Sequence, residues 1–286
     1  MTTPATPPMP ERAEISGSTR IYAVLGCPVA QVKAPALLNP VFARLGLDAV
    51  LVPVLAEPEY LGEIVRGLQR IGNLDGLLVT VPHKAQVRQY ADTVSSAVTQ
   101  SGSANALRRE PDGRWSAENF DGIGFVRGLR ATGFDLAGKR VSLIGAGGAG
   151  GALAAALLAA GAAHLDVCDR DGDRVGALVA RLGPYWPGRA AGAATPRLDG
   201  ADLVVNATPL GLRPDDPLPF DVAGLPPGAM VADIIMEPRE TALLRAAEAR
   251  GHRIHHGSHM LTQQLDLYRD FFRLDTVERS EQAELT

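Results

Sequence analysis

A glycine-rich stretch at residues 140–151, RVSLIGAGGAGG, limits most strongly what this chain can fold into. A short apolar run at 141–144 precedes the glycines, and an alanine- and leucine-rich segment follows them to about residue 160. A second apolar run at 164–168 completes the order strand, turn, helix, strand, in which the spacing G-x-G-x-x-G binds a dinucleotide. We therefore predict a Rossmann-type nucleotide-binding unit, with a purely structural tight turn as the alternative.

Each glycine of this stretch has its own predicted task. Gly145 makes the tight turn, Gly147 lets the backbone approach a pyrophosphate, and Gly150 lets the helix pack closely on the strand. Free N–H groups at the N-terminus of the helix hold the anion. The predicted cofactor loop consists of Gly145, Ala146, Gly147, Gly148, Ala149 and Gly150.

The composition is that of a soluble globular protein and excludes several other classes. The chain has 286 residues, 46% of them hydrophobic, and a formal net charge of −4, so no basic field favours nucleic acid or a membrane surface. No apolar run reaches transmembrane length. Only Cys27 and Cys168 are present, too few for a disulfide framework, and we expect a cytoplasmic protein. Residues 1–19 start with a proline-rich run without an apolar signal core, which predicts a disordered tail.

The order of the expected elements predicts an α/β chain with two domains. The first 90 residues alternate apolar strand runs with helical patterns, which indicates a parallel sheet of their own. A hairpin at 105–117 is expected at the edge of that sheet. We place a first domain at 20–120 and a Rossmann domain with a linker helix at 121–255. One long amphipathic helix is expected over 259–274.

Short motifs along the chain narrow the choice among nucleotide-binding proteins. In order they are GCPV at 26–29, VTVPHK at 79–84, Asn105, NFDGIGF at 119–125, NATPLG at 206–211 and GSHMLTQQ at 257–264. From about residue 21 to 272, they resemble the shikimate/quinate dehydrogenase family. The resemblance implies a parallel-sheet substrate domain completed by a C-terminal helix within 256–286, a Rossmann domain, and a cleft for a cyclic alcohol and a nicotinamide.

The resemblance also implies a catalytic pair, Lys84 and Asp121. Oxidation of an alcohol needs a hydride acceptor, a group that takes the hydroxyl proton, and positive charge near the developing oxyanion. Lysine supplies the charge, and either residue of the pair can carry the proton. Taken singly, a lysine near a helix start and an aspartate in a turn are ordinary solvated residues. By resemblance, Thr80, Asn105 and Gln264 contact the substrate.

The chain departs from the family pattern around the expected substrate pocket. Two serines that hold a substrate carboxylate in the family are replaced by Val32 and Ala34, and neither side chain can donate a hydrogen bond. Leu78, Phe120 and Met236 likewise replace an asparagine, a threonine and a tyrosine. The resemblance implies an enzyme for shikimate, quinate or a related ring. With these replacements we expect a retained redox site that binds shikimate poorly, and a substrate that is less anionic or carries its acid elsewhere. An aminoshikimate-like or quinate-like ring is the alternative within the same enzyme class. A non-catalytic nucleotide-binding sensor is the alternative from another class.

The residues after the second nucleotide strand bear on the choice of cofactor. Asp169 can accept a hydrogen bond from the ribose 2′-hydroxyl and repel a 2′-phosphate, whereas Arg170 favours the phosphate. We predict that NAD is preferred and that NADP is possible. By resemblance Asn206, Thr208 and Gly257 also lie at the cofactor.

The remaining expectations concern metals and partners. Histidines gather at 252–259, but no acidic or thiol partners are evident beside them, so no metal is expected. The expected partner is a small-molecule substrate, with no nucleic acid and no membrane. A monomer or a homodimer is expected.

Overall fold

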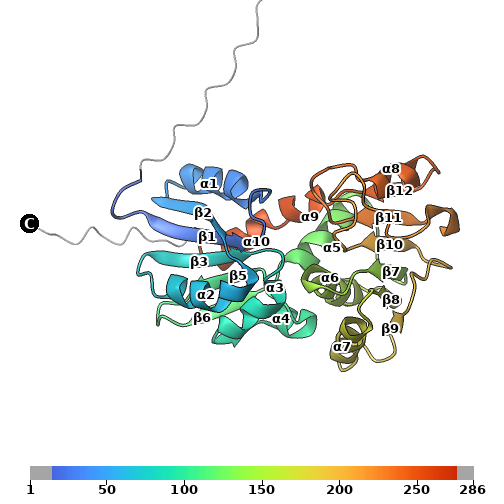
Figure 1. Ribbon diagram of the computed structural model, residues 1–286, viewed down its shortest axis with the longest axis horizontal. Coiled ribbons are helices and arrows are strands. Elements are labelled where there is room, and N and C mark those ends of the chain that lie inside the picture. Colours follow the sequence, from blue (N-terminus) through green and yellow to red (C-terminus); the bar gives the residue numbers. More distant parts are fainter. Residues whose placement is uncertain (1–14, 276–286) are drawn as a thin grey trace, which may run out of the picture.

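The computed structural model describes residues 15–275, which form two α/β lobes (Figure 1). Each lobe is built on a six-stranded sheet. Helix α5 (Asp121–Ala131) leads from the first lobe into the second, and the C-terminal helices return from the second lobe to the first. None of the helices within residues 15–275 is long and apolar enough to cross a membrane.

The first lobe has strand order β2-β1-β3-β5-β6-β4. Its strands are β1 (Arg20–Gly26), β2 (Ala49–Leu55), β3 (Leu74–Val79), β4 (Thr93–Val94), β5 (Ala106–Arg109) and β6 (Trp115–Glu118). The pairs β1–β2 and β1–β3 are parallel, whereas β5 pairs antiparallel with β3 and β6. The expected hairpin is therefore present. It does not form the edge of the sheet, because the two-residue strand β4 pairs with β6 outside it.

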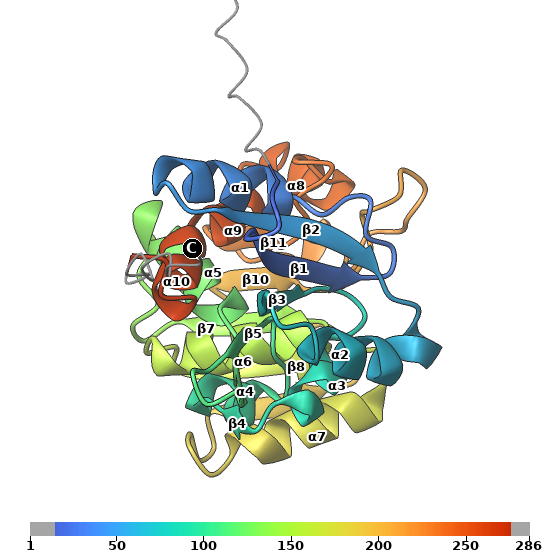
Figure 2. The same cartoon turned by 90° about the vertical axis from the view of Figure 1, so that its left-hand side faces the viewer.

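Helices cover both faces of this first sheet (Figure 2). They are α1 (Ala34–Arg44), η1 (Pro58–Tyr60), α2 (Leu61–Gln69), α3 (Lys84–Val87), η2 (Arg88–Tyr90) and α4 (Ser96–Ser101). Alternate residues of β1 serve the two faces, as a strand requires. Tyr22 joins an apolar cluster with Phe42 of α1, whereas Leu25 joins a second cluster with Val65 of α2. The same strand thus contributes apolar side chains to the packing on both faces of the sheet.

The second lobe is a parallel sheet of order β12-β11-β10-β7-β8-β9. Its elements are β7 (Arg140–Ile144), α6 (Gly148–Ala159), β8 (His164–Cys168), α7 (Gly172–Leu182), β9 (Ala190–Ala193), β10 (Leu203–Asn206), η3 (Val222–Gly224), β11 (Met230–Asp233), α8 (Ala242–Glu248) and β12 (Arg253–His255). The chain order reverses between β7 and β10. In open α/β sheets ligands bind at the carboxyl ends of the strands on either side of such a point.

The C-terminal segment is two helices, so the expected single helix over 259–274 is wrong. Helix α9 (Ser258–Thr262) ends before Gln263, and α10 (Leu265–Phe271) begins after Gln264. Met260 of α9 belongs to the core of the second lobe, whereas Tyr268 belongs to the core of the first. We attribute the break to this double attachment, because the turn lets the two short helices bury their apolar sides in different lobes.

The start of the described chain differs from the expected tail. Residues 1–14 of that tail lie outside the described residues. Within 15–19, the hydroxyls of Ser18 and Thr19 each donate to the carboxylate of Asp48 at 2.6 Å. The last part of the predicted tail is therefore held against the start of β2.

Candidate active site

Lys84 and Asp121 form a direct ion pair. Lys84 is the first residue of α3 and Asp121 the first residue of α5. Lys84 Nζ lies 2.6 Å from Asp121 Oδ2, and the two side chains are only 13% and 4% exposed. Asp121 also lies at the N-terminus of α5, an 11-residue helix whose dipole favours negative charge at that end. The structure thus joins the two residues that the sequence singled out for catalysis.

Two carboxamides contact the other oxygen of the same carboxylate. Asn105 Nδ2 donates to Asp121 Oδ1 at 2.9 Å, and Gln264 Nε2 donates to it at 3.3 Å. Asn105 Oδ1 in turn accepts from the backbone N–H of Phe120 at 3.0 Å. Asn105 and Gln264, which the resemblance assigns to the substrate, are therefore gathered around Asp121 by segments far apart in the chain.

Sequence reasoning missed Tyr268, which lies at the same place. Its hydroxyl donates to Gln264 Oε1 and accepts from Asn105 Nδ2 at 3.3 Å. Burial, with a smaller contribution from the charge of Asp121, raises the pKa of this phenol well above its usual value. Its one sequence signal is its place four residues after Gln264, on the same side of a helix. We call Lys84, Asn105, Asp121, Gln264 and Tyr268 the Asp121 network.

The glycine loop of the second lobe lies directly against this network. A Cβ on Gly148 would come within 2.8 Å of Cβ of Lys84, so a glycine there permits the close approach. The hydroxyl of Ser103 donates to the carbonyl of Gly148 at 2.6 Å, and Arg181 of α7 donates to the carbonyl of Ser101 at 3.0 Å. The ion pair and the loop that would hold a dinucleotide are thus adjacent.

The loop itself has the geometry of a phosphate cradle. Gly145 has φ of +111°, and a Cβ on Gly150 would lie 1.9 Å from the carbonyl oxygen of Gly145, so the turn is tight and the helix packs closely. A Cβ on Gly147 would meet nothing within 4 Å among the described residues. No side chain caps the start of α6 in the described chain, so its first backbone N–H groups have no side-chain acceptor there. These residues fit a pyrophosphate group.

The acidic residue after β8 is held beside the loop. Asp169 Oδ2 accepts from the backbone N–H of Ala146 at 2.7 Å, and its Oδ1 accepts from that of Asp171 at 3.0 Å. Asp171 caps α7 by accepting from the N–H of Arg174 at 3.2 Å. Arg170 is exposed between the two aspartates. Asp169, Arg170 and Asp171 therefore follow β8 directly beside the glycine loop.

Asn206 and Thr208 shape the loop after β10. The buried Asn206 donates to the carbonyl of Leu210 at 3.0 Å and to Asp233 at 3.2 Å, and it accepts from the hydroxyl of Thr208 at 2.7 Å. Burial raises the pKa of Asp233, a second residue that sequence reasoning missed. Gly257 permits a further close approach, since a Cβ there would lie 2.5 Å from the backbone of Ile234.

Four of the five positions that depart from the family pattern share one apolar environment. The buried Leu78 and Phe120 belong to the cluster that contains Tyr268, and the half-buried Val32 and Ala34 pack against it.

Thr80 follows β3, half-buried, with its methyl group facing Gly26. Met236 lies apart from these, half-buried in the loop after β11. Beside it, Lys33 pairs with Glu237 of the second lobe at 3.3 Å, with both side chains exposed.

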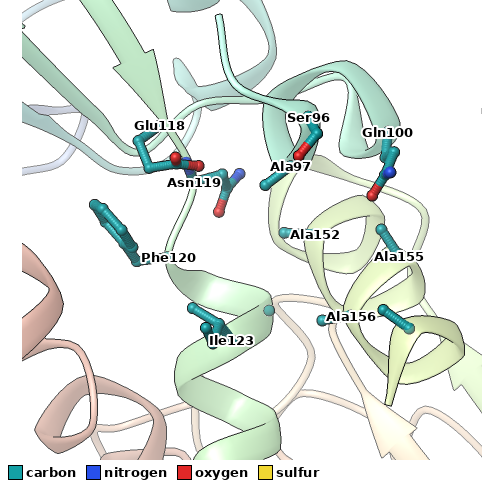
Figure 3. A pocket seen from close by; sticks show the side chains of 12 residues that line it. Ser96, Ala97, Gln100, Glu118, Asn119, Phe120, Ile123, Ala152, Ala155 and Ala156 are labelled. Atoms are coloured by element: carbon teal, nitrogen blue, oxygen red, sulfur yellow. The ribbon is translucent and has the colours of Figure 1, made fainter. Parts of the chain in front are cut away.

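A separate cavity of about 260 Å³ lies between α4, α5 and α6 (Figure 3). Alanines of α6, such as Ala152 and Ala156, line one side, and Glu118 and Gln100 contribute polar groups. Its lining, all within the described chain, includes neither Lys84 nor Asp121, although Phe120 belongs to it. This cavity is therefore distinct from the ion pair.

The histidine-rich segment does not form a metal site in the part of the chain that the structure describes. No group of three or more His, Cys, Asp or Glu side chains there is arranged to hold an ion. His255 is buried at 1% exposure and stacks on His259, with ring centroids 4.8 Å apart. Burial, together with the neighbouring histidines His259 and His256, lowers its pKa to about 4.

Comparison with known proteins assigns the chain to a family. Residues 24–107 match the model of the shikimate dehydrogenase substrate binding domain. A shikimate dehydrogenase (NADP(+)) of Rubrobacter xylanophilus is 40% identical over 248 residues, which are 83% of this chain and 84% of that protein.

Solved structures agree with this assignment. A quinate dehydrogenase from Corynebacterium glutamicum in complex with NAD has a TM-score of 0.77 at 29% identity, over 90% of this chain and 94% of that one. A ligand-free 5-ketofructose reductase of Gluconobacter has a TM-score of 0.77 at 28% identity, over 89% and 92%. With such similarity along most of its length, the chain belongs to the shikimate/quinate dehydrogenase family of oxidoreductases.

Proposed function

We propose that this chain transfers a hydride between a ring alcohol and a nicotinamide dinucleotide, with Lys84 and Asp121 as its catalytic pair. The observation that carries the proposal is the 2.6 Å contact between Lys84 Nζ and Asp121 Oδ2, directly beside Gly148 of the glycine loop. We further propose that residues 20–120 with the last helix bind the substrate and that residues 121–255 bind the nucleotide.

In the proposed reaction, Lys84 donates a hydrogen bond to the substrate oxygen. Its ammonium charge stabilises the alkoxide character that develops as the C–H bond breaks, which is the largest contribution that such a site makes. Asp121 holds the ammonium in place, and the proton that the hydroxyl group loses passes to the Lys84–Asp121 pair, whose carboxylate supplies the basic site while Lys84 is an ammonium. The low exposure of both side chains strengthens these interactions, because little water screens them.

The cofactor would be held by residues 145–150, with its pyrophosphate at the N-terminus of α6. When bound, the nicotinamide supplies the hydride acceptor. We propose that NAD is preferred, because Asp169 places negative charge where a 2′-phosphate would lie, whereas the carboxylate of Asp171 is paired with Arg174 at 3.0 Å. Arg170 leaves NADP as an alternative, and the Rubrobacter relative is named for NADP(+).

The substrate is proposed to be less anionic than shikimate. Val32 and Ala34 present apolar groups where the family resemblance expects two serines, and both pack against an apolar cluster. Losing two hydrogen bonds to a carboxylate costs roughly 3 kcal/mol, or about a hundredfold in affinity. The Gluconobacter relative is named for a ketosugar, so this fold is not restricted to one ring acid.

The test is a substrate screen that follows nicotinamide absorbance with both NAD and NADP. Shikimate, quinate and uncharged ring polyols are offered at equal concentrations. We expect turnover of at least one uncharged polyol, and a KM for shikimate in the millimolar range. A micromolar KM for shikimate would overturn the altered pocket, and no turnover of any alcohol would overturn the enzymatic function.

A further inference from the structure

The hydrogen bonds of the Asp121 network close into a ring. Asp121 Oδ1 accepts from both carboxamides, at 2.9 Å from Asn105 and 3.3 Å from Gln264. The hydroxyl of Tyr268 joins those carboxamides on their far side, accepting from Asn105 and donating to Gln264. Each member of the ring therefore fixes the orientation of the next.

The two carboxamides of the ring differ in how many of their hydrogen-bonding groups already have a partner. Both N–H bonds of the Asn105 amide are engaged, one with Asp121 and one with Tyr268, and its oxygen accepts from the backbone of Phe120. Gln264 uses its oxygen for Tyr268 and one N–H for Asp121. One N–H of Gln264 has no partner within the ring, so Gln264 is held by fewer contacts than Asn105.

We infer that Tyr268 is a positioning residue, whose phenol holds the carboxamide of Gln264 on Asp121. The inference rests on the proposed catalytic function of Asp121. The carboxamide of Gln264 has two orientations that differ by the exchange of N and O. The hydroxyl of Tyr268 and the carboxylate of Asp121 together select the orientation that presents N–H, and not oxygen, to Asp121. Asn105 does not need the phenol for its orientation, because its oxygen already accepts from the backbone N–H of Phe120.

The surroundings of Tyr268 favour a permanent role as donor. The side chain is buried, its ring packs edge-on against Phe120 with centroids 5.3 Å apart, and it stacks near Phe272 at 6.3 Å. Because the raised pKa keeps the phenol protonated at neutral pH, the hydrogen bond to Gln264 Oε1 persists under assay conditions. The aromatic packing does not depend on the hydroxyl group, so the two contributions can be separated.

Tyr268→Phe removes the hydroxyl and keeps the ring. Because the oxygen of Gln264 then loses its donor and the carboxamide is held only by its longer contact with Asp121, we expect kcat to fall about tenfold while KM for the alcohol changes less than about twofold. In a Gln264→Ala background the same substitution should lower kcat less than about twofold, because its route of action is already gone. Tyr22→Phe is the matched control, since Tyr22 is buried in the same cluster and makes none of the contacts of the ring.

A second measurement does not need turnover. The side-chain amide signal of Gln264, identified by its disappearance in Gln264→Ala, should exchange with solvent at least about tenfold faster in Tyr268→Phe than in the wild type. Unchanged exchange, an equal loss of kcat in Tyr22→Phe, or an equal loss of kcat in the Gln264→Ala background would each overturn the inference. If the wild type oxidises no alcohol, the proposed function fails, and the exchange measurement alone still decides whether Tyr268 orients Gln264.

Discussion

The charges of the site are compensated residue by residue. Asp121 is 3% exposed and has partners on both oxygens: Lys84 on one, and the carboxamides of Asn105 and Gln264 on the other. A buried carboxylate without such partners would cost several kcal/mol in desolvation. The same partners hold the carboxylate and the ammonium in one orientation, so the groups that compensate the buried charge also fix the geometry that the proposed proton transfer needs.

Lys84→Ala tests this arrangement at the residue scale. Without the ammonium, the developing alkoxide loses its stabilising charge, so we expect kcat to fall by about a hundredfold or more. The affinity for the dinucleotide, measured by isothermal titration calorimetry, should change much less. Lys139→Ala is the control, because Lys139 pairs with Asp202 in the second lobe and should leave kcat unchanged. Turnover at the wild-type rate in Lys84→Ala would rule out the catalytic pair.

At the scale of elements, the strand–turn–helix unit β7–α6 depends on how close its backbones approach. Gly145, Gly148 and Gly150 each lie against backbone or side-chain atoms at less than 3 Å from an added Cβ, whereas Gly147 faces open space. The glycines of one motif therefore serve two purposes. Three allow packing, and one leaves room for a ligand.

Gly150→Ala and Gly147→Ala should separate these purposes. The added methyl group of Gly150→Ala overlaps the carbonyl of Gly145, so we expect a loss of about 1–3 kcal/mol or more in the free energy of unfolding. Gly147→Ala should unfold at nearly the wild-type denaturant concentration and bind dinucleotide at least about tenfold more weakly. Denaturant titration and calorimetry measure both. Equal stability of the two variants would contradict the packing argument.

The buried histidine of β12 makes the contact between β12, α5 and α9 sensitive to pH. The pKa of His255 is lowered to about 4, whereas an unfolded histidine titrates near 6.5. Between these values the unfolded state binds more protons, so the free energy of unfolding should fall as pH decreases from about 6.5 to 4, by up to about 3 kcal/mol. Above pH 6.5 the contribution of His255 is constant.

His255→Phe should remove most of that pH dependence, because phenylalanine carries no proton and fits beside Phe125. Urea unfolding of both proteins at pH 4.5 and 7 measures the change. His252→Gln serves as the control, since the half-buried His252 lies outside this contact and should leave the slope as in the wild type. An unaltered slope in His255→Phe would assign the pH dependence to other groups.

On the scale of the whole molecule, the first lobe is proposed to bind the substrate and the second lobe the nucleotide. Val32 and Ala34, which stand where the family resemblance expects carboxylate-binding serines, lie in the first lobe, whereas Asp169 lies in the second. The lobes meet at Lys84 against Gly148, so the proposed hydride transfer would take place where they touch. Changes in substrate preference and in cofactor preference should therefore be separable.

The double variant Val32→Ser with Ala34→Ser and the single variant Asp169→Asn test this separation. The first should lower KM for ring acids by up to about a hundredfold through two restored donors, with KM for the nucleotide unchanged. The second should raise kcat/KM for NADP relative to NAD by about tenfold, with KM for the alcohol unchanged. Steady-state kinetics with both substrates varied measures each effect. A variant that shifts both preferences equally would contradict independent lobes.

The sequence by itself determined the strands, the glycine turn and the family, because these depend on local patterns. The alternating apolar runs predicted most strands of both sheets, and the spacing of glycines predicted β7 and α6. The two-residue strand β4 and the six-residue helix α4 were missed, because neither is long enough to show a period. Local patterns carry this information because a strand or a turn is formed by neighbours in the chain.

Only the tertiary structure decided how the site is assembled. Asn105 meets Tyr268 across 163 positions and Gln264 meets Asp121 across 143, and no spacing in the sequence announces such contacts. The break between α9 and α10 likewise depends on two cores in different lobes. Hydrogen-bond partners of buried polar groups are chosen by the packing of whole elements, so the residue types were predictable and their connections were not.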